Sequence, residues 1–202
     1  FWFNLIVSNA VMENTLVLYR ILIVSTLLAL TACGGGGSSS DSTPTQPRTV
    51  QTAQGVFLDS AVEGLSYQSG ALSGFTDDSG AFQYEVGETV TFSIGDIVIG
   101  TASGADIVTP LDLVAMATDT SDPVVINIAR FLQTLDDDGD PDNGIRILVS
   151  VRDLAADLTI NFDQSIDAFT DDGDVQSAIA TLTTVTDAGA RFLITADAAQ
   201  EH

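Results

Sequence analysis

Apolar and polar residues alternate along residues 54–102, and turn residues interrupt the alternation at short intervals. A period of two with frequent turns is typical of antiparallel strands that bury one face. The apolar positions that we expect to face one way are Phe82, Tyr84 and Val86, then Val90, Phe92 and Ile94, then Ile97 and Ile99. With turns at Asp77–Gly80 and Gly95–Asp96, the pattern predicts that these three strands form a meander.

The period becomes helical after residue 122. Ser121-Asp122-Pro123 combines a capping side chain with a proline whose missing N–H costs nothing at a helix start. Apolar residues then recur at helical spacing at Val125, Ile128, Leu132 and Leu135. The sequence therefore predicts an amphipathic helix over residues 123–135 whose apolar stripe packs into the core.

Shorter elements are expected in the remainder of the chain. Residues 145–151 look like a strand, and residues 175–182 and 196–202 look like helices. Asp174 would cap the first of these helices, and the second would be entered through Thr195.

A short apolar block near the beginning of the chain resembles a secretory signal. Residues 21–30 are apolar, follow Arg20 and precede small residues, whereas a spanning helix needs roughly 20 apolar residues. The alternative is an uncleaved membrane anchor, because Phe1–Val11 is also apolar. Against it, Arg20 interrupts the apolar stretch, and a charge at the centre of a bilayer is costly.

The four residues Leu30-Thr31-Ala32-Cys33 resemble the lipobox of bacterial lipoproteins. That resemblance implies cleavage before Cys33, lipidation of Cys33 and attachment to the membrane through the lipid. Gly34 after the cysteine would favour the outer membrane of a Gram-negative bacterium. Residues 34–49 are almost entirely small or polar, so we expect a flexible tether with a reach of roughly 20–25 Å.

Two further stretches resemble known extracellular modules. Residues 74–84 are similar to the Thr-Asp-x-x-Gly-x-Phe stretch of carboxypeptidase-regulatory-like, prealbumin-like β-sandwiches, which are usually non-catalytic accessory modules. Residues 55–64 and 109–113, with continuation through Asn143-Gly144-Ile145, resemble a module near the N-terminus of proteobacterial surface lipoproteins and large secreted proteins.

Together these observations predict a mainly β fold with α-helices: a small antiparallel β-sandwich followed by an α/β extension, after a signal peptide and a tether. The expected parts are residues 1–32 for the signal, 33–53 for the lipidated cysteine and tether, 54–108 for the sandwich and 109–202 for the extension.

The chain is strongly acidic, with 28 acidic and 6 basic side chains and a net charge of −22. Such a charge repels nucleic acid and anionic headgroups and favours binding of cations. An alternative reading is a solvated surface adapted to salty surroundings. Because Cys33 is the only cysteine, a disulfide framework and a cysteine-based zinc site are excluded.

Five carboxylates lie within residues 136–142, directly after the predicted helix. Negative charge is unfavourable at a helix C-terminus, and a bound hard cation would reverse that penalty. The expected calcium ligands are Asp136, Asp138, Asp140 and Asp142, with Asn143 supporting the turn. As an EF-hand loop the stretch departs from the pattern, with Pro141 in place of the glycine and Ile147 in place of the glutamate. The alternative is a solvated acidic turn.

Catalysis is not expected within these residues. The single histidine is His202, and the sequence contains no Gly-x-Ser-x-Gly, no phosphate loop with lysine and no His-Glu-x-x-His. A glycosidase could use paired carboxylates, but a raised carboxylate pKa needs an apolar pocket, and the densest group lies in a predicted turn.

We therefore expect a non-catalytic module of the cell envelope that acts as a spacer, a scaffold or an adhesive surface, with a polysaccharide or protein as its extracellular partner. The alternative is an N-terminal accessory part of a larger secreted enzyme whose catalytic domain follows residue 202. The chain starts at Phe1, with Met12 as the natural start, and it ends within a predicted helix, which favours continuation. Carbohydrate binding could use Phe57, Tyr67, Phe75 or Tyr84. The alternative is that these aromatic residues belong to the core, and alternation favours that for Phe82 and Tyr84 at least.

Overall fold

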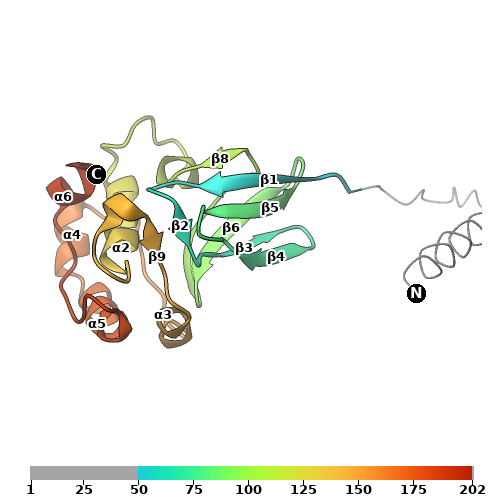
Figure 1. The fold of residues 1–202 in the computed structure, drawn as a ribbon. Helices are drawn as coiled ribbons and strands as arrows, with labels where there is room; N and C mark the ends of the chain where they lie inside the picture. The colour runs from blue at the N-terminus through green and yellow to red at the C-terminus, as the bar shows by residue number, and fades with distance from the viewer. Residues whose placement is uncertain (1–49, 202) are drawn as a thin grey trace, which may run out of the picture. The chain divides into compact units, whose positions relative to one another are not determined.

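The computed structural model describes residues 50–201. The expected signal, the lipidation of Cys33 and the tether up to residue 49 lie outside the described residues. Figure 1 shows the strands grouped toward one end of this part and α2, α4, α5 and α6 toward the other, with β2 and β9 between them. None of the helices in this part is long and apolar enough to cross a membrane.

The first sheet has three strands in the order β5-β1-β8. The central strand, β1 (Thr52–Phe57), pairs antiparallel with β5 (Ala81–Glu85) and parallel with β8 (Ile107–Val108). Gly55 lies opposite Phe82 in this register. A Cβ atom at Gly55 would lie 2.2 Å from the Ala105 carbonyl oxygen, so only glycine allows this close approach.

The second sheet has four antiparallel strands in the order β4-β3-β6-β7. Its members are β3 (Ser66–Ser69), β4 (Leu72–Phe75), β6 (Thr89–Ile94) and β7 (Ile97–Ser103). The ladder between β6 and β7 is irregular between Phe92 and Ser93. A short parallel pair, β2 (Val62–Glu63) with β9 (Ile145–Arg146), joins residues far apart in the sequence.

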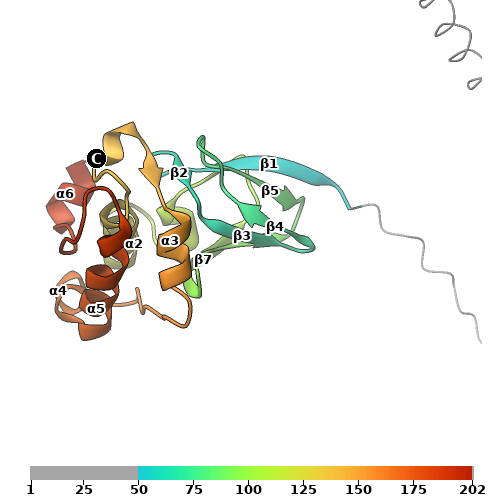
Figure 2. The same ribbon diagram turned by 60° about the horizontal axis from the view of Figure 1, so that its bottom comes forward.

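The helices are short except for α2 (Pro123–Thr134) and α5 (Gly173–Leu182). The others are α3 (Val149–Leu154), α4 (Ile166–Asp171) and α6 (Ala196–Glu201), together with three 3-10 turns at η1 (Pro110–Leu113), η2 (Pro141–Asn143) and η3 (Thr183–Val185). Figure 2 shows α3 beside the group formed by α2, α4, α5 and α6, and α3 contacts α5. The fold is thus a mixed one, with several sheets and a set of helices.

One continuous hydrophobic core runs through strands and helices. On the strand side, the Phe92 ring meets the edges of Phe57 and Phe82, with ring centres 4.8 and 5.0 Å apart. On the helix side, Phe162 contacts Phe131 and Phe169 at 5.4 and 5.6 Å. Edge-to-face aromatic pairs contribute roughly 0.5–1.5 kcal/mol beyond the area they bury.

The alternating pattern correctly predicted which residues are buried. Phe82, Tyr84 and the five later positions of the predicted set up to Ile99 are all buried, and only Val86, one residue beyond β5, is exposed. The predicted meander is wrong, because β5 pairs with β1 and not with β6. Alternation defines the faces of a strand but carries no information about its hydrogen-bonded neighbour.

The predicted helix over residues 123–135 is confirmed as α2, and Asp122 caps it by accepting a hydrogen bond from the Val124 N–H at 2.9 Å. The helix expected over residues 196–202 is confirmed as α6 through Glu201, with the Ala198 N–H bonded to the Thr195 hydroxyl at 3.2 Å.

Two details of the helical half differ from the sequence prediction. The strand expected over residues 145–151 ends at Arg146, because its partner β2 has only two residues, and α3 begins at Val149. The cap of α5 is Asp172 rather than Asp174. The Asp172 carboxylate accepts hydrogen bonds from the N–H groups of residues 174 and 175.

Candidate functional site

The predicted calcium ligands lie in the loop formed by residues 136–144, called here the aspartate loop, which connects α2 to β9. Asp136 is almost completely buried, with 1% of its surface exposed, whereas Asp138, Asp140, Asp142 and Asn143 are exposed. The loop therefore has an inner carboxylate and an outer group of oxygen-bearing side chains.

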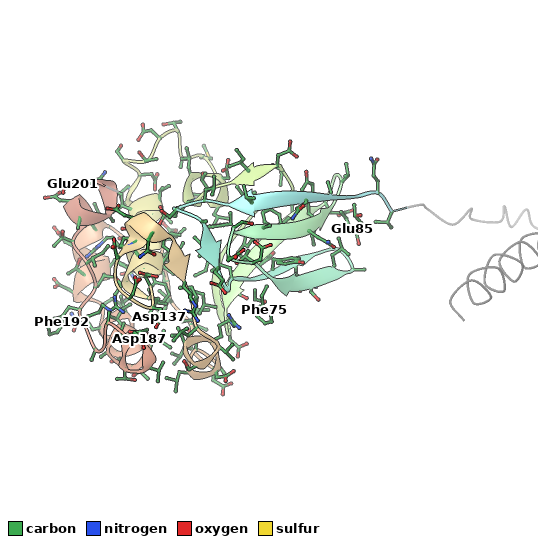
Figure 3. All side chains as sticks on the ribbon, in the orientation of Figure 1. Phe75, Glu85, Asp137, Asp187, Phe192 and Glu201 are labelled. Atoms are coloured by element: carbon green, nitrogen blue, oxygen red, sulfur yellow. The ribbon has the colours of Figure 1, made fainter. Side chains whose placement is uncertain are left out.

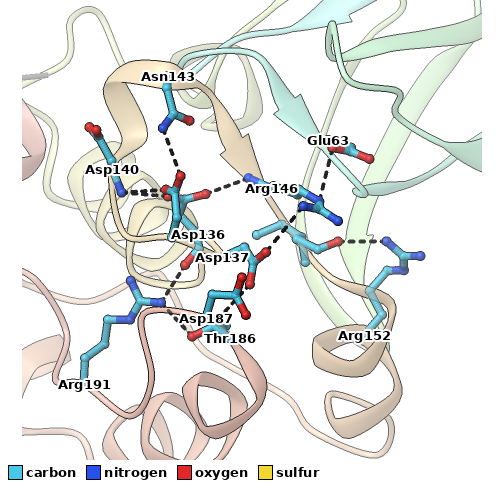
Figure 4. A network of polar contacts seen from close by, with 12 residues as sticks. Glu63, Asp136, Asp137, Asp140, Asn143, Arg146, Arg152, Thr186, Asp187 and Arg191 are labelled. Atoms are coloured by element: carbon cyan, nitrogen blue, oxygen red, sulfur yellow. Dashed lines mark hydrogen bonds and ion pairs between the residues drawn. The ribbon is translucent and has the colours of Figure 1, made fainter.

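The inner carboxylate of Asp136 accepts hydrogen bonds from the backbone of the loop and of β9 (Figure 4). One oxygen accepts a hydrogen bond from the Arg146 N–H at 2.8 Å, and the other accepts one from the Asp140 N–H at 2.9 Å. Asp138 accepts hydrogen bonds from the same Asp140 N–H at 3.0 Å and from the Asn143 side-chain amide at 3.0 Å. The buried carboxylate of Asp136 and the exposed carboxylate of Asp138 thus both hold the turn at Asp140.

Sequence reasoning missed Asp137 as a site residue, although it is the residue that connects the loop to a distant part of the chain. Asp137 is 7% exposed, and its side chain accepts a hydrogen bond from the Asp187 N–H at 2.9 Å and forms an ion pair with Arg146 at 3.5 Å. The Asp137 carbonyl also accepts the Ala188 N–H at 2.8 Å. Asp137 had no distinguishing sequence signal, because it is one of three consecutive aspartates.

Arginines surround the aspartate loop and offset its charge. The Arg191 guanidinium donates to the Asp136 carbonyl at 2.6 Å and to the Thr186 hydroxyl at 2.7 Å. Arg146 also lies 3.7 Å from Glu63 on β2. The unfavourable position of these carboxylates beside a helix C-terminus is therefore compensated by arginine side chains and by backbone N–H groups.

The protonation behaviour of the inner and outer carboxylates differs in direction. Burial raises the pKa of Asp136, and the neighbouring Asp138 carboxyl raises it further. The hydrogen bond from Asn143, followed by that from the Asp140 N–H, lowers the pKa of Asp138. Of the two carboxylates, Asp136 is therefore the first to take up a proton as the pH falls.

The hydrogen bonds of Asp136 and Asp137 connect the aspartate loop to β9 and to residues 187 and 188, and we call this set of contacts the joint. Within residues 50–201, no group of three or more His, Cys, Asp or Glu side chains is arranged so that it could hold a metal ion. Both oxygens of Asp136 already accept backbone hydrogen bonds. A cation at this loop would therefore have to displace hydrogen bonds at Asp136 and also at Asp138, whose two oxygens accept from the Asp140 N–H and the Asn143 amide.

A second group of buried polar side chains lies on α2 and was not predicted. Asn127, Arg130 and Gln133, three residues apart, are each at most 3% exposed. The Arg130 guanidinium donates to the Ile194 carbonyl at 2.7 Å and to the Thr170 hydroxyl at 3.0 Å. Their regular spacing in the sequence was a usable signal, because it places them on one stripe of the helix.

The aromatic candidates are divided between core and surface. Phe57 and Tyr84 are buried and Tyr67 is half-buried, as expected for core positions. Phe75 is 57% exposed at the end of β4, and the Arg152 guanidinium lies 4.3 Å from the centre of its ring. Figure 3 shows Phe75 and Phe192 in different regions of the described part, so they do not form one aromatic surface.

In comparisons with known proteins, no family model, no curated protein and no solved structure matches this chain. The residues and their geometry therefore carry the functional argument.

Proposed function

We propose that this chain is a non-catalytic, lipid-anchored module of the bacterial cell envelope that serves as a spacer or scaffold, with a surface available for adhesion. The proposal is supported mainly by the contacts of the two buried carboxylates, which hold segments of the fold together. Asp136 and Asp137 bind backbone N–H groups and an arginine of neighbouring segments, so that they join α2, β9 and residues 186–188. Such bonds stiffen a fold and leave both groups engaged.

We also propose that the two larger sheets correspond to the β-sandwich of prealbumin-like modules. The contacts of Phe92 on β6 with Phe57 on β1 and with Phe82 on β5 support this assignment, because they connect the two sheets through their aromatic side chains. The sandwich would act as the rigid body, and the tether would hold it away from the membrane.

Calcium binding at the aspartate loop is part of the proposal. It is supported by the exposed oxygen-bearing side chains of Asp138, Asp140, Asp142 and Asn143 beside the buried Asp136. Calcium prefers carboxylate and amide oxygens and tolerates irregular coordination. A cation there would stiffen a joint that already links two parts of the fold.

The anchor is tested by expressing the full chain in a Gram-negative bacterium and measuring incorporation of labelled palmitate. We expect the wild-type chain to carry the label and to sediment with outer membranes. Cys33→Ser should lose the label, and the matched variant Gly34→Asp should keep the label but leave the outer-membrane fraction. Labelling of the Cys33→Ser variant would refute the assignment of the lipidated residue.

The choice between an adhesive and a purely spacing role is tested by cosedimentation of the purified full chain with whole cells, peptidoglycan and polysaccharide. Saturable binding to one of them would support adhesion. A monomer that binds none of them would restrict the proposal to a spacer.

A further inference from the structure

Two hollows in the surface lie on either side of the segment that connects α3 to α4, and both are lined by Ile160. The first has a volume of about 520 Å³ and lies between this segment, β7 and the start of α2. The second has a volume of about 320 Å³ and lies between this segment, the end of α3 and α5. Because both are lined by Ile160, the two hollows lie next to each other, and we call them together the groove, with each hollow as one half.

Each half of the groove combines an apolar floor with two aspartates. Val98, Val114 and Val124 contribute to the floor of the first half, and Leu154, Leu158 and Ala178 to that of the second. The aspartates are Asp122 and Asp163 in the first half and Asp157 and Asp174 in the second. No arginine lines either half, so the groove presents apolar surface under a negative field.

The backbone inside the groove is available for pairing. Thr159 and Ile160 belong to no helix or strand, and within residues 50–201 no hydrogen bond involves their backbone N–H or C=O groups. On the other side of the larger hollow, β7 is an edge strand of its sheet. Unpaired backbone next to side-chain pockets is the arrangement by which proteins bind extended peptides.

We propose that this groove binds an extended segment of a partner protein in which apolar and basic side chains alternate. The apolar side chains would fill the hollows on both sides of Ile160, and the basic ones would face the four aspartates. The main chain of the partner would pair with Thr159 and Ile160. Peptide binding in the groove adds a class of partner to the proposed envelope module. It does not depend on the lipid anchor, so an experiment can refute either proposal without affecting the other.

The test uses the full chain in detergent micelles with labelled isoleucine, leucine and valine methyl groups. The probes are two peptides of equal length and charge, one alternating Lys and Val and the other alternating Lys and Ser. At about 0.15 M salt, where long-range attraction is screened, we expect the Lys-Val peptide to bind roughly tenfold more tightly. Its binding should shift the methyl signals of Val98, Leu158 and Ile160.

Variants separate the groove from general attraction between a polycation and an acidic protein. Asp157→Asn combined with Asp174→Asn changes only exposed side chains, so the fold should persist, and the Lys-Val peptide should bind at least several-fold more weakly. The matched control, Asp78→Asn with Asp197→Asn, removes the same charge elsewhere and should retain binding. Equal affinity for both peptides, or equal loss in both double variants, would overturn the proposal.

Discussion

Replacing Asp137 is the most direct test of whether the contacts of the aspartate loop stabilise the fold. The Asp137→Ala substitution removes a buried carboxylate that accepts the Asp187 N–H at 2.9 Å and pairs with Arg146 at 3.5 Å. A hydrogen bond to a charged acceptor contributes about 1.5–3 kcal/mol. The ion pair adds little, roughly 0.2–1 kcal/mol, because the Arg146 side chain is 60% exposed.

We therefore expect Asp137→Ala to lower the free energy of unfolding by about 2–3 kcal/mol. Asp137→Asn keeps an oxygen for the Asp187 N–H and should cost about 1 kcal/mol, while Asp78→Ala in an exposed turn should stay within about 0.5 kcal/mol. Urea unfolding of the full chain, followed by circular dichroism, measures all three, and the slope with urea should not change. If Asp137→Ala cost no more than Asp78→Ala, the joint would not contribute to stability and the reasoning would be refuted.

Three further predictions concern other parts of the fold. The side-chain amide of Gln164 and two backbone N–H groups lower the pKa of Asp172, so its carboxylate stabilises the fold above the ordinary value of 3.8, and this stabilisation is lost as the pH falls through the lowered folded-state pKa. In the Asp172→Asn variant the free energy of unfolding should therefore decrease less steeply as the pH is lowered than in the wild type. Urea unfolding at a series of acidic pH values measures this. If calcium binds the aspartate loop, millimolar calcium but not magnesium should raise the melting midpoint over that in EDTA, and Asp138→Ala with Asp140→Ala should abolish the rise. Gly64→Ala should destabilise the fold in thermal melts, because Gly64 has φ of +88° and its new Cβ would lie 2.3 Å from a backbone carbonyl oxygen.

The local elements were predictable where the sequence carries a periodic signal. Val90, Phe92 and Ile94 alternate and are completely buried, and Asp122-Pro123 marks the start of α2. The neighbour of β5 could not be predicted, because β2, β3 and β4 lie between it and its partner β1 in the chain and side-chain alternation does not encode pairing. The pairing of β2 with β9 was hidden for the same reason.

The aspartate loop was predictable as a place of concentrated charge but not as a joint. The sequence identifies the carboxylates, whereas burial separates Asp136 and Asp137 from the exposed Asp138 and Asp140. That separation depends on Arg191, which lies about fifty residues later and donates to the Asp136 carbonyl. A contact between segments so far apart leaves no trace in local spacing, so the sequence left a calcium site and a solvated acidic turn as alternatives.

The arginines of the described residues indicate why this acidic chain contains no lysine. Arg130 donates to the Ile194 carbonyl, Arg152 donates to the carbonyls of residues 64 and 147, and Arg191 donates to the carbonyls of residues 136 and 189. A guanidinium has five donors in a fixed plane, so one side chain can tie together backbone carbonyls from two segments. A lysine ammonium is a compact, strongly hydrated point charge and would lose more hydration at these buried and half-buried positions. Within residues 50–201, three of the four arginines thus close the fold by donating to backbone carbonyls, and Arg146 forms ion pairs with Glu63 and Asp137.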